Sequence, residues 1–442
     1  MSAIPLWFQL GEEKPGHCSE QPIPPPGLFQ SRALAVFFGL FLFCSAFSIA
    51  ASQISLALCL ILFVWLLTQG STRVDDSLRP VLFAWSIYLL WLVVSSVVND
   101  NVLRSLSAIR EEWLLVILPI GGYLHRRPDW SRRLMLVLGC ALLLASAYGI
   151  IQHFTGVSLP GSHALHRAGT YWRLSGNFSH PLTYGYYVVT ATVFFLVYLI
   201  VLRKSIGRWS RSLLAVTVVA GLGASALCNS RGPMLALVVG LAAAGFLVGK
   251  WKWIVAITAA TVLLLFVFSP DLPQVFAGRI KNDLLTENQS GRLFIWSNSL
   301  KIAGENPAFG CGPGNFPAAY TAQLGPEAKT GSVGHAHNDF IHQAATGGFP
   351  ALGLYLVFWA VVLLRLWQTR RRAGETTAAF ALSTGALAAS AAFLAGSVTE
   401  AAIADEELRQ VLFALWAAGL SQFSPAPAHE AKLKSSGATL CQ

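Results

Sequence analysis

Long runs of apolar residues alternate with short polar segments along almost the whole chain. Each run approaches the length that a helix needs to cross a bilayer, roughly 20 residues. The runs are continuous rather than alternating, which favours helices over a barrel, and helices satisfy their own backbone hydrogen bonds in lipid. The pattern predicts an all-α polytopic membrane protein with about twelve transmembrane helices. They are expected at about 33–50, 53–69, 80–98, 107–124, 134–153, 181–202, 212–228, 233–249, 253–269, 346–367, 376–398 and 405–422.

The two ends and two long loops complete the expected organisation. Residues 1–30 are polar and rich in proline, which predicts a disordered cytoplasmic tail, and residues 423–442 predict a second cytoplasmic tail. Between the tails, residues 31–422 form the expected transmembrane domain. Its polar loops 153–180 and 270–345 are the longest, and the second has room for short helices. We expect these two loops to form the active site.

The distribution of charge gives the orientation. Only 12% of the 442 residues are charged, against about 25% in a soluble domain. A net charge of +10 can indicate nucleic-acid binding, but here the lysines and arginines gather in loops that the helix count places on one side. Such an excess is typical of cytoplasmic loops. No nucleic-acid partner is expected, both termini are predicted in the cytoplasm, and both long polar loops on the opposite face.

A cluster of titratable residues lies at the end of the second long loop, directly before an apolar run. It contains His335, His337, Asp339 and His342. A histidine, with an ordinary pKa near 6.5, can accept a proton at neutral pH, so His337 is predicted to be a catalytic base, with His335 and Asn338 as candidate supporting residues. Two alternatives remain open. The same spacing would suit a metal site, although no second ligand cluster is evident and no metal is expected, and Asn338 or Asp339 could simply cap a helix.

Four arginines lie on the face that is otherwise poor in positive charge: Arg167, Arg173, Arg231 and Arg292. Each alone could be a solvated loop charge or could pair with lipid phosphate. Together they favour a binding site for pyrophosphate carried on a lipid, because the planar guanidinium group matches pairs of phosphate oxygens. Glu400, Asp405 and Glu406 are predicted on the same face, at the outer end of the last apolar run, where they could orient the acceptor or His337 or could be solvated.

Four short motifs follow one another in this part of the chain. They are Arg173–Pro181, Asn229–Gly232, Ser290–Trp296 with Asn306–Phe316, and His337-Asn338 followed after nine residues by Gly348. In this order, on one face of a twelve-helix protein, they resemble the O-antigen ligase family, which also includes O-antigen polymerases and bacterial protein O-oligosaccharyltransferases. The chain departs from the family pattern at Leu182, Thr346 and Ala351.

The resemblance implies an activity. Ligases of this family transfer a finished glycan from undecaprenyl pyrophosphate to the lipid A–core oligosaccharide, at the periplasmic face of the bacterial inner membrane, without metal or other cofactor. The expected partners are therefore that donor, that acceptor and membrane lipids. By the family pattern the essential histidine corresponds to His337, and the two essential loop arginines to Arg173 and Arg292. Arg231 belongs to a further Ser-Arg-Gly element.

The chemistry of such a transfer agrees with these residue types. The acceptor hydroxyl needs a base, and the departing pyrophosphate needs positive charge. A single direct displacement would invert the anomeric centre. A polymerase or a protein O-oligosaccharyltransferase would use the same groups. A membrane transporter is a third hypothesis, but it should carry polar residues at mid-membrane and show repeat symmetry. Here the charges gather at one surface, which favours chemistry there.

Overall fold

The computed structural model describes residues 28–159, 165, 167–168, 171–228, 230–268, 277–278, 291–325 and 333–421. The predicted tail 423–442, nearly all of the tail 1–30 and much of loop 270–345 therefore lie outside the described residues. Most described residues are helical, and the regular elements also include the short antiparallel strands β1 (Arg167–Ala168) and β2 (Tyr171–Trp172). The predicted all-α fold class is confirmed.

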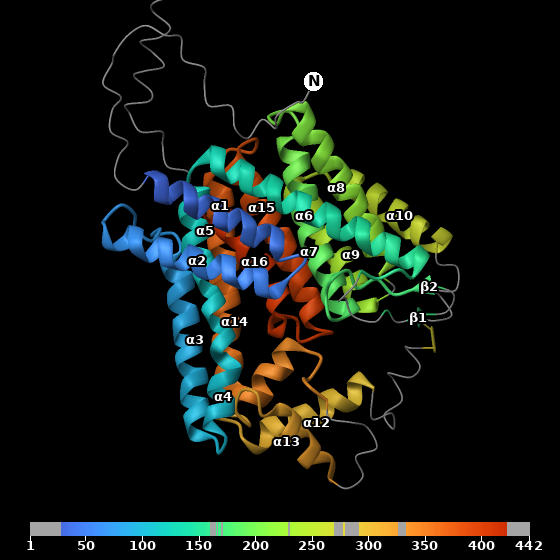
Figure 1. Cartoon of the computed structure of the whole chain (residues 1–442). Helices are drawn as coiled ribbons and strands as arrows, with labels where there is room; N and C mark the ends of the chain where they lie inside the picture. Colours follow the sequence, from blue (N-terminus) through green and yellow to red (C-terminus); the bar gives the residue numbers. More distant parts are fainter. Residues whose placement is uncertain are drawn as a thin grey trace, which may run out of the picture.

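Helices occur in the order that the apolar runs predict (Figure 1). They are α1 (Leu28–Cys44), α2 (Ile49–Thr68), α3 (Arg79–Val98), α4 (Val102–Ala108), α5 (Ile117–His125), α6 (Pro128–Thr155), α7 (Pro181–Leu202), α8 (Arg208–Leu227), α9 (Arg231–Val248), α10 (Trp251–Phe268), α12 (Arg292–Glu305), α13 (Phe316–Leu324), α14 (Asp339–Arg372), α15 (Ala378–Ser397) and α16 (Glu406–Leu420), with 3₁₀ helices η1 (Ile109–Val116) and η3 (Ala402–Ala404). Within the described ranges, 8 helices are long and apolar enough to cross a membrane: α2, α3, α6, α7, α8, α9, α14 and α15. Twelve crossings remain a prediction.

The expected continuous helix at 107–124 is wrong. The chain there forms α4, then the tighter turns of η1, then α5. Glu111 and Glu112 lie in η1 and pair with Arg409 of α16, with nitrogen–oxygen distances of 3.4 and 3.0 Å. A buried guanidinium group requires a charged partner, so these ion pairs, rather than an apolar face, fix the segment in place.

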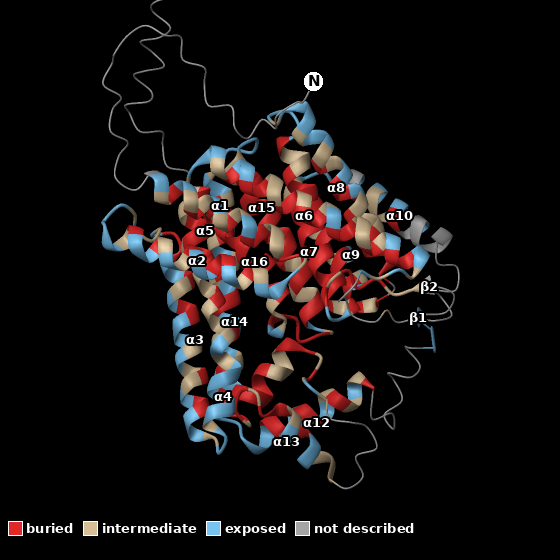
Figure 2. Ribbon diagram, viewed as in Figure 1, coloured by how far each residue is buried: buried red, intermediate tan, exposed pale blue. Residues whose placement is uncertain are grey.

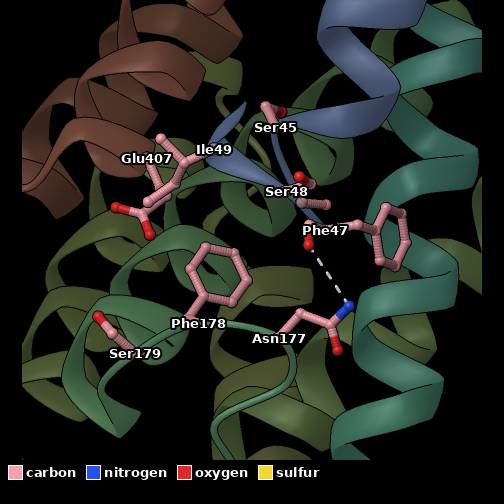
Figure 3. A pocket seen from close by; sticks show the side chains of 9 residues that line it. Ser45, Phe47, Ser48, Ile49, Asn177, Phe178, Ser179 and Glu407 are labelled. Atoms are coloured by element: carbon pink, nitrogen blue, oxygen red, sulfur yellow. Dashed lines mark hydrogen bonds between the residues drawn. The ribbon is translucent and has the colours of Figure 1, made fainter. Parts of the chain in front are cut away.

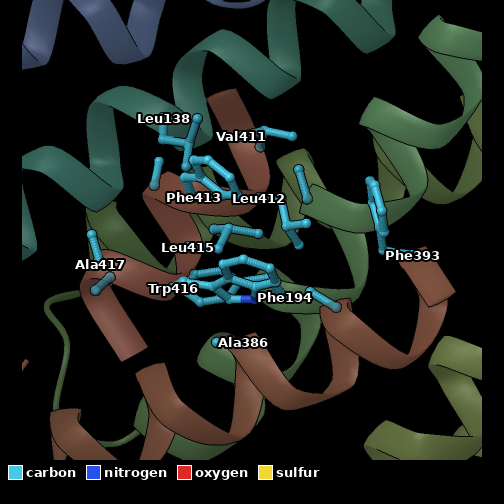
Figure 4. Close-up of a cluster of buried hydrophobic side chains, with 14 of the residues drawn as sticks. Leu138, Phe194, Ala386, Phe393, Val411, Leu412, Phe413, Leu415, Trp416 and Ala417 are labelled. Carbon is cyan, nitrogen blue, oxygen red and sulfur yellow. The ribbon is translucent and has the colours of Figure 1, made fainter. Parts of the chain in front are cut away.

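Burial separates central helices from peripheral ones (Figure 2). The apolar window of α7 is 83% buried and that of α15 is 72% buried, against 33% for α2. Aromatic rings of α16, including Trp416 and Phe413, pack with Phe194 of α7 at the centre (Figure 4). On peripheral α3, Phe83 and Leu90 recur on one face and are 69% and 63% exposed. Extended apolar faces of this kind indicate contact with lipid; the chain is a membrane protein.

The long helix α14 is broken at Gly348, where φ is +76°. A loop following α12 fills the break. The Phe349 N–H donates to the Pro307 carbonyl at 2.8 Å, and the Cys311 N–H to the Ala345 carbonyl at 2.9 Å. A Cβ at Gly348 would collide with the Ala308 carbonyl, which explains why the loop motif and this glycine occur together. The break anchors the loop after α12 to the first turns of α14.

Candidate functional site

His337 and Glu400 form the centre of the site. Glu400 lies in the connection between α15 and η3, and its side chain is only 5% exposed. The His337 Nδ1 atom lies 2.8 Å from the Glu400 Oε1 atom, and the imidazole is 31% exposed. When Nδ1 carries the hydrogen and donates it to the carboxylate, Nε2 keeps a lone pair. The pair can therefore present a basic nitrogen to a substrate from a buried anchor.

The backbone around His337 is held on three sides. His337 has a φ of +49°, the single positive φ among the non-glycine residues that the structure describes. Next to it, Asn338 caps α14 by accepting the Ile341 N–H at 3.0 Å, and its amide donates to the Val398 carbonyl at 2.9 Å. The indole of Trp296 donates to the His337 carbonyl at 3.3 Å. Asn338 is thus a helix cap that also ties His337 to the segment carrying Glu400.

Two further cationic or basic groups face the same carboxylate. His335 Nδ1 lies 3.3 Å from Glu400 Oε1, and Arg292 Nη2 lies 3.8 Å from Oε2. Arg292 and Trp296 are four residues apart on α12, so one face of that helix supplies both the arginine and the contact to His337. Burial alone would raise the pKa of Glu400, but the His337 hydrogen bond and the charges of His337, His335 and Arg292 lower it overall. Glu400 is a carboxylate at neutral pH.

The pKa of His335 is also lowered, but here burial is the largest cause. Burial lowers the pKa of His335 below its usual value, Glu400 raises it, and His337, His180 and Arg292 lower it further. The pKa shift therefore favours the neutral form. His180, which caps α7 and precedes the last residue of the Arg173–Pro181 motif, is among the groups that lower this pKa.

Arg173 reaches the site through a series of contacts. Its Nη2 donates to Ser230 Oγ at 2.9 Å, and its Nε is buried without a hydrogen-bond acceptor among the residues described. Two residues beyond Ser230, Gly232 lies against the Tyr186 hydroxyl and Thr399 Oγ1, which themselves lie 3.0 Å apart. Thr399 directly precedes Glu400. The Arg173–Pro181 and Asn229–Gly232 motifs therefore contact each other, and the second lies against the residue that precedes Glu400. Tyr186 takes part from within an apolar run that gave no signal in the sequence.

The other predicted residues are placed differently. Arg231 opens α9 beside Ser230, at the same junction. Arg167 lies on β1, with its guanidinium group 5.5 Å from the ring of Trp172, and this contact ties it to the strand pair rather than to Glu400. Asp339 and His342 are buried in other surroundings: both Asp339 oxygens accept the Ile403 N–H, and the His342 ring packs against Phe316.

The structure contains a cavity of about 190 Å³ (Figure 3). It lies between the α1–α2 turn, the segment that leads into α7, and the start of α16. Its lining residues are Ser45, Ala46, Phe47, Ser48, Ile49, Asn177, Phe178, Ser179 and Glu407. Hydroxyl, amide and carboxylate groups share it with two phenyl rings. Ser179 precedes His180 in the chain, but none of His335, His337 and Glu400 lines the cavity.

The residues that could hold a metal ion differ from the set that the sequence suggests. Asp339 and His342 point elsewhere, whereas ligand atoms of His335, His337 and Glu400 all lie within 4.8 Å of one another. Two imidazole nitrogens and one carboxylate oxygen are common zinc ligands.

Two acidic residues near Glu400 hold helices together instead of facing His337. Asp405 accepts the Thr183 hydroxyl at 2.7 Å, and Glu406 accepts the amides of Gln53 and Gln410. Burial raises the pKa of Asp405 from 3.8 to about 7, outweighing the Thr183 hydrogen bond, and Glu407 and Glu400 add to the rise.

This shift predicts a dependence of stability on pH. The folded state favours protonated Asp405, so its stabilising contribution is complete below about pH 4 and is lost as the pH rises through about 7. Asp405→Asn removes that loss and keeps an oxygen for Thr183. Between pH 5 and 8, we expect the thermal midpoint of the wild type to fall relative to that of Asp405→Asn, measured by scanning fluorimetry. Asp100→Asn, an exposed control, should run parallel to wild type; a parallel course for Asp405→Asn would contradict the prediction.

Comparison with known proteins bears on what this site does. Residues 213–356 match the family described as O-Antigen ligase. The matched segment is about a third of the chain and is similar to that family. It extends from α8 into α14 and contains Arg231, Arg292 and His337, whereas Arg173 and Glu400 lie outside it. No curated protein matches the chain. The match to residues 213–356 confirms the predicted resemblance. The O-antigen ligase family consists of membrane glycosyltransferase-type enzymes that use lipid-linked glycans.

Proposed function

We propose that this protein is an O-antigen ligase. It transfers a glycan from undecaprenyl pyrophosphate to the lipid A–core oligosaccharide, at the periplasmic face of the bacterial inner membrane and without a required metal. The observation that carries the proposal is the shared carboxylate of Glu400, with His337 on one oxygen at 2.8 Å and Arg292 on the other at 3.8 Å. One carboxylate thus holds a base and a cation together. The motifs that supply them occur along the chain in the order typical of the family.

The reaction is a single displacement. His337 Nε2 accepts the proton of an acceptor hydroxyl, and the hydroxyl oxygen forms a bond to the anomeric carbon of the donor. The bond between that carbon and the pyrophosphate oxygen breaks, and undecaprenyl pyrophosphate leaves with the electron pair. Attack opposite the leaving group inverts the anomeric centre. Glu400 is a positioning residue, because it fixes the imidazole hydrogen at Nδ1 and steadies the imidazolium that forms.

The arginines stabilise the charge that develops on the leaving group. Arg292 shares the Glu400 carboxylate with His337, and Arg173 has a buried Nε without an acceptor among the described residues, so both can donate to phosphate oxygens. Because the pyrophosphate is already a stable anion, it can leave without being protonated. Arg231 is proposed to contact the same group, and Arg167 to contribute from the strand pair.

A deletion strain tests the activity. With the gene removed, lipopolysaccharide should lose all glycan attached to its core, while lipid-linked polymer accumulates. Core capped by a single repeat unit would instead identify a polymerase, and unchanged lipopolysaccharide with loss of protein glycosylation would identify a protein O-oligosaccharyltransferase. Purified protein with lipid-linked glycan and core acceptor should reproduce the transfer.

Glu400→Gln tests the positioning role. The glutamine oxygen can still accept the His337 Nδ1–H, but a neutral amide stabilises the imidazolium less well. We expect kcat to fall about 10- to 100-fold, as for the loss of other orienting partners, with a smaller change in KM. Initial rates at varied donor concentration give both constants. Glu400→Asp, which restores the charge, should recover part of the kcat; a purely structural role would instead lower the amount of folded enzyme and leave kcat per folded molecule unchanged.

A further inference from the structure

Three ligand atoms converge at the histidine cluster with a spacing that suits a metal ion. His337 Nδ1 and His335 Nδ1 lie 2.8 and 3.3 Å from the same Glu400 oxygen. In a tetrahedral zinc site the metal–ligand bonds of about 2.0–2.2 Å separate neighbouring ligand atoms by roughly 3.4 Å. The two nitrogen–oxygen distances would lengthen by roughly 0.6 and 0.1 Å to reach that spacing, and all three ligand atoms lie within 4.8 Å of one another.

One of the two imidazole lone pairs that such a site requires is present, and the other needs the His337 ring hydrogen to shift from Nδ1 to Nε2. The His337 N–H donates to His335 Nδ1 at 3.3 Å, so that nitrogen carries a lone pair rather than a hydrogen. Glu400 is buried beneath the two rings, which are 36% and 31% exposed. An ion can therefore approach from the open side and reach an anionic ligand at the bottom.

We propose that His335, His337 and Glu400 bind a divalent transition-metal ion, with Zn²⁺ the best match, and that the bound ion switches transfer off. Two imidazole nitrogens and one carboxylate select a borderline metal of this kind over Mg²⁺ or Ca²⁺, which prefer oxygen ligands. The fourth position remains open to water. The site lies within the catalytic cluster, so its inhibitory effect rests on the proposed function, whereas its binding of metal does not.

Inhibition follows from the tautomer of His337. In the metal-free enzyme the hydrogen is on Nδ1 and the lone pair on Nε2. A metal at Nδ1 takes the lone pair of that nitrogen, and the ring hydrogen then resides on Nε2. Nε2, which takes the proton of the acceptor hydroxyl in the metal-free enzyme, then carries a hydrogen and can no longer act as the base. The ion blocks the reaction without occupying the position of either substrate.

Arg292 does not occupy the metal position. Its Nη2 lies 3.8 Å from Oε2, whereas both imidazoles face Oε1 of the same carboxylate. The arginine can keep its partner while the other oxygen binds the ion. Its positive charge weakens metal affinity, which suits a site that fills and empties with the metal concentration rather than one that holds a permanent ion.

Binding is tested with Co²⁺ and Zn²⁺ on the full-length protein, freed of metal by chelation and then separated from the chelator. Co²⁺ should give visible d–d absorption of a four-coordinate ion, and Zn²⁺ should displace it. In His335→Asn, the asparagine Oδ1 can replace the histidine Nδ1 as acceptor of the His337 N–H. The amide oxygen is, however, a poor ligand for Co²⁺ or Zn²⁺. We expect its affinity for Co²⁺ to fall at least about tenfold. His180→Asn, at a neighbouring histidine that caps α7, should bind as wild type does.

Two results would overturn the site: no Co²⁺ absorption with the wild type, or equal affinity in His335→Asn. The effect on activity is read separately, as the ratio of transfer with Zn²⁺ to transfer with chelator for each variant. Zn²⁺ should inhibit wild type at a concentration at least about tenfold lower than that needed for His335→Asn. Metal binding without inhibition would overturn the switch alone. An enzyme that transfers nothing even in chelator would contradict the proposed function and leave the binding result standing.

Discussion

His337→Asn is expected to lower kcat about 10²- to 10⁴-fold, the usual contribution of a general base, while the protein still folds and inserts. Asparagine has no basic nitrogen, so the acceptor hydroxyl would lose its proton acceptor. Its amide can still donate to Glu400, and the backbone contacts to Trp296 and Asn338 remain. The measurement is single-turnover transfer of lipid-linked glycan by purified variants at saturating donor.

The choice of asparagine follows from the backbone. His337 has a φ of +49°, a region that asparagine tolerates better than most residues. His337→Ala would combine loss of the base with strain, so we expect it to transfer as poorly as His337→Asn but to unfold at a lower temperature. Wild-type rates in His337→Asn would remove the base from the mechanism.

Arg292→Ala is expected to lower kcat about 10²- to 10³-fold, as for the loss of a donor that stabilises a developing anion. The variant leaves Glu400 Oε2 without its cation and the departing pyrophosphate without a guanidinium group. Arg292→Lys keeps the charge but loses the planar fork, so it should regain only part of the rate. Rates are compared by the same single-turnover measurement, with donor binding measured separately.

Lys301→Ala is the matched control for Arg292→Ala. Lys301 is also on α12, and it contacts Asn298 at 3.4 Å rather than the Glu400 cluster. Lys301→Ala lowers the charge of α12 by one unit, as Arg292→Ala does, and should leave the rate close to that of wild type. If the two variants lose activity equally, the role of Arg292 is general electrostatics of the loop and not stabilisation of the leaving group.

The apolar pattern predicted the helices well where lipid or the protein core surrounds them. It failed where hydrogen bonds and ion pairs of polar side chains determine the backbone conformation. The expected helix at 107–124 breaks because Glu111 and Glu112 serve Arg409, and α14 begins at Asp339 rather than near 346 because Asn338 caps it. Hydropathy cannot register a polar turn whose partners lie far away in the sequence.

The candidate site was predicted by residue type more than by geometry. Histidine and arginine stand out in an apolar chain, so the histidine cluster and the four arginines could be singled out directly. The choice of Arg173 and Arg292 among the arginines came from the resemblance to the family. Glu400 was one of several acids near the last helix, and only the fold shows that it, and not Asp405, faces His337. Tyr186 gave no signal, because a tyrosine within an apolar helix has the same appearance whether it packs or lines a site.

Arg409 has a consequence for how the chain is made. Its partners Glu111 and Glu112 precede it by 298 and 297 residues, so they leave the ribosome long before it does. Until α16 is in place, the nearly buried Glu112 carboxylate lacks its ion-pair partner, and burying it unpaired would cost about 3–5 kcal/mol. Docking of α16 therefore completes the packing around this carboxylate during biogenesis. A nascent chain cut short before α16 would expose an acidic defect for quality control to recognise.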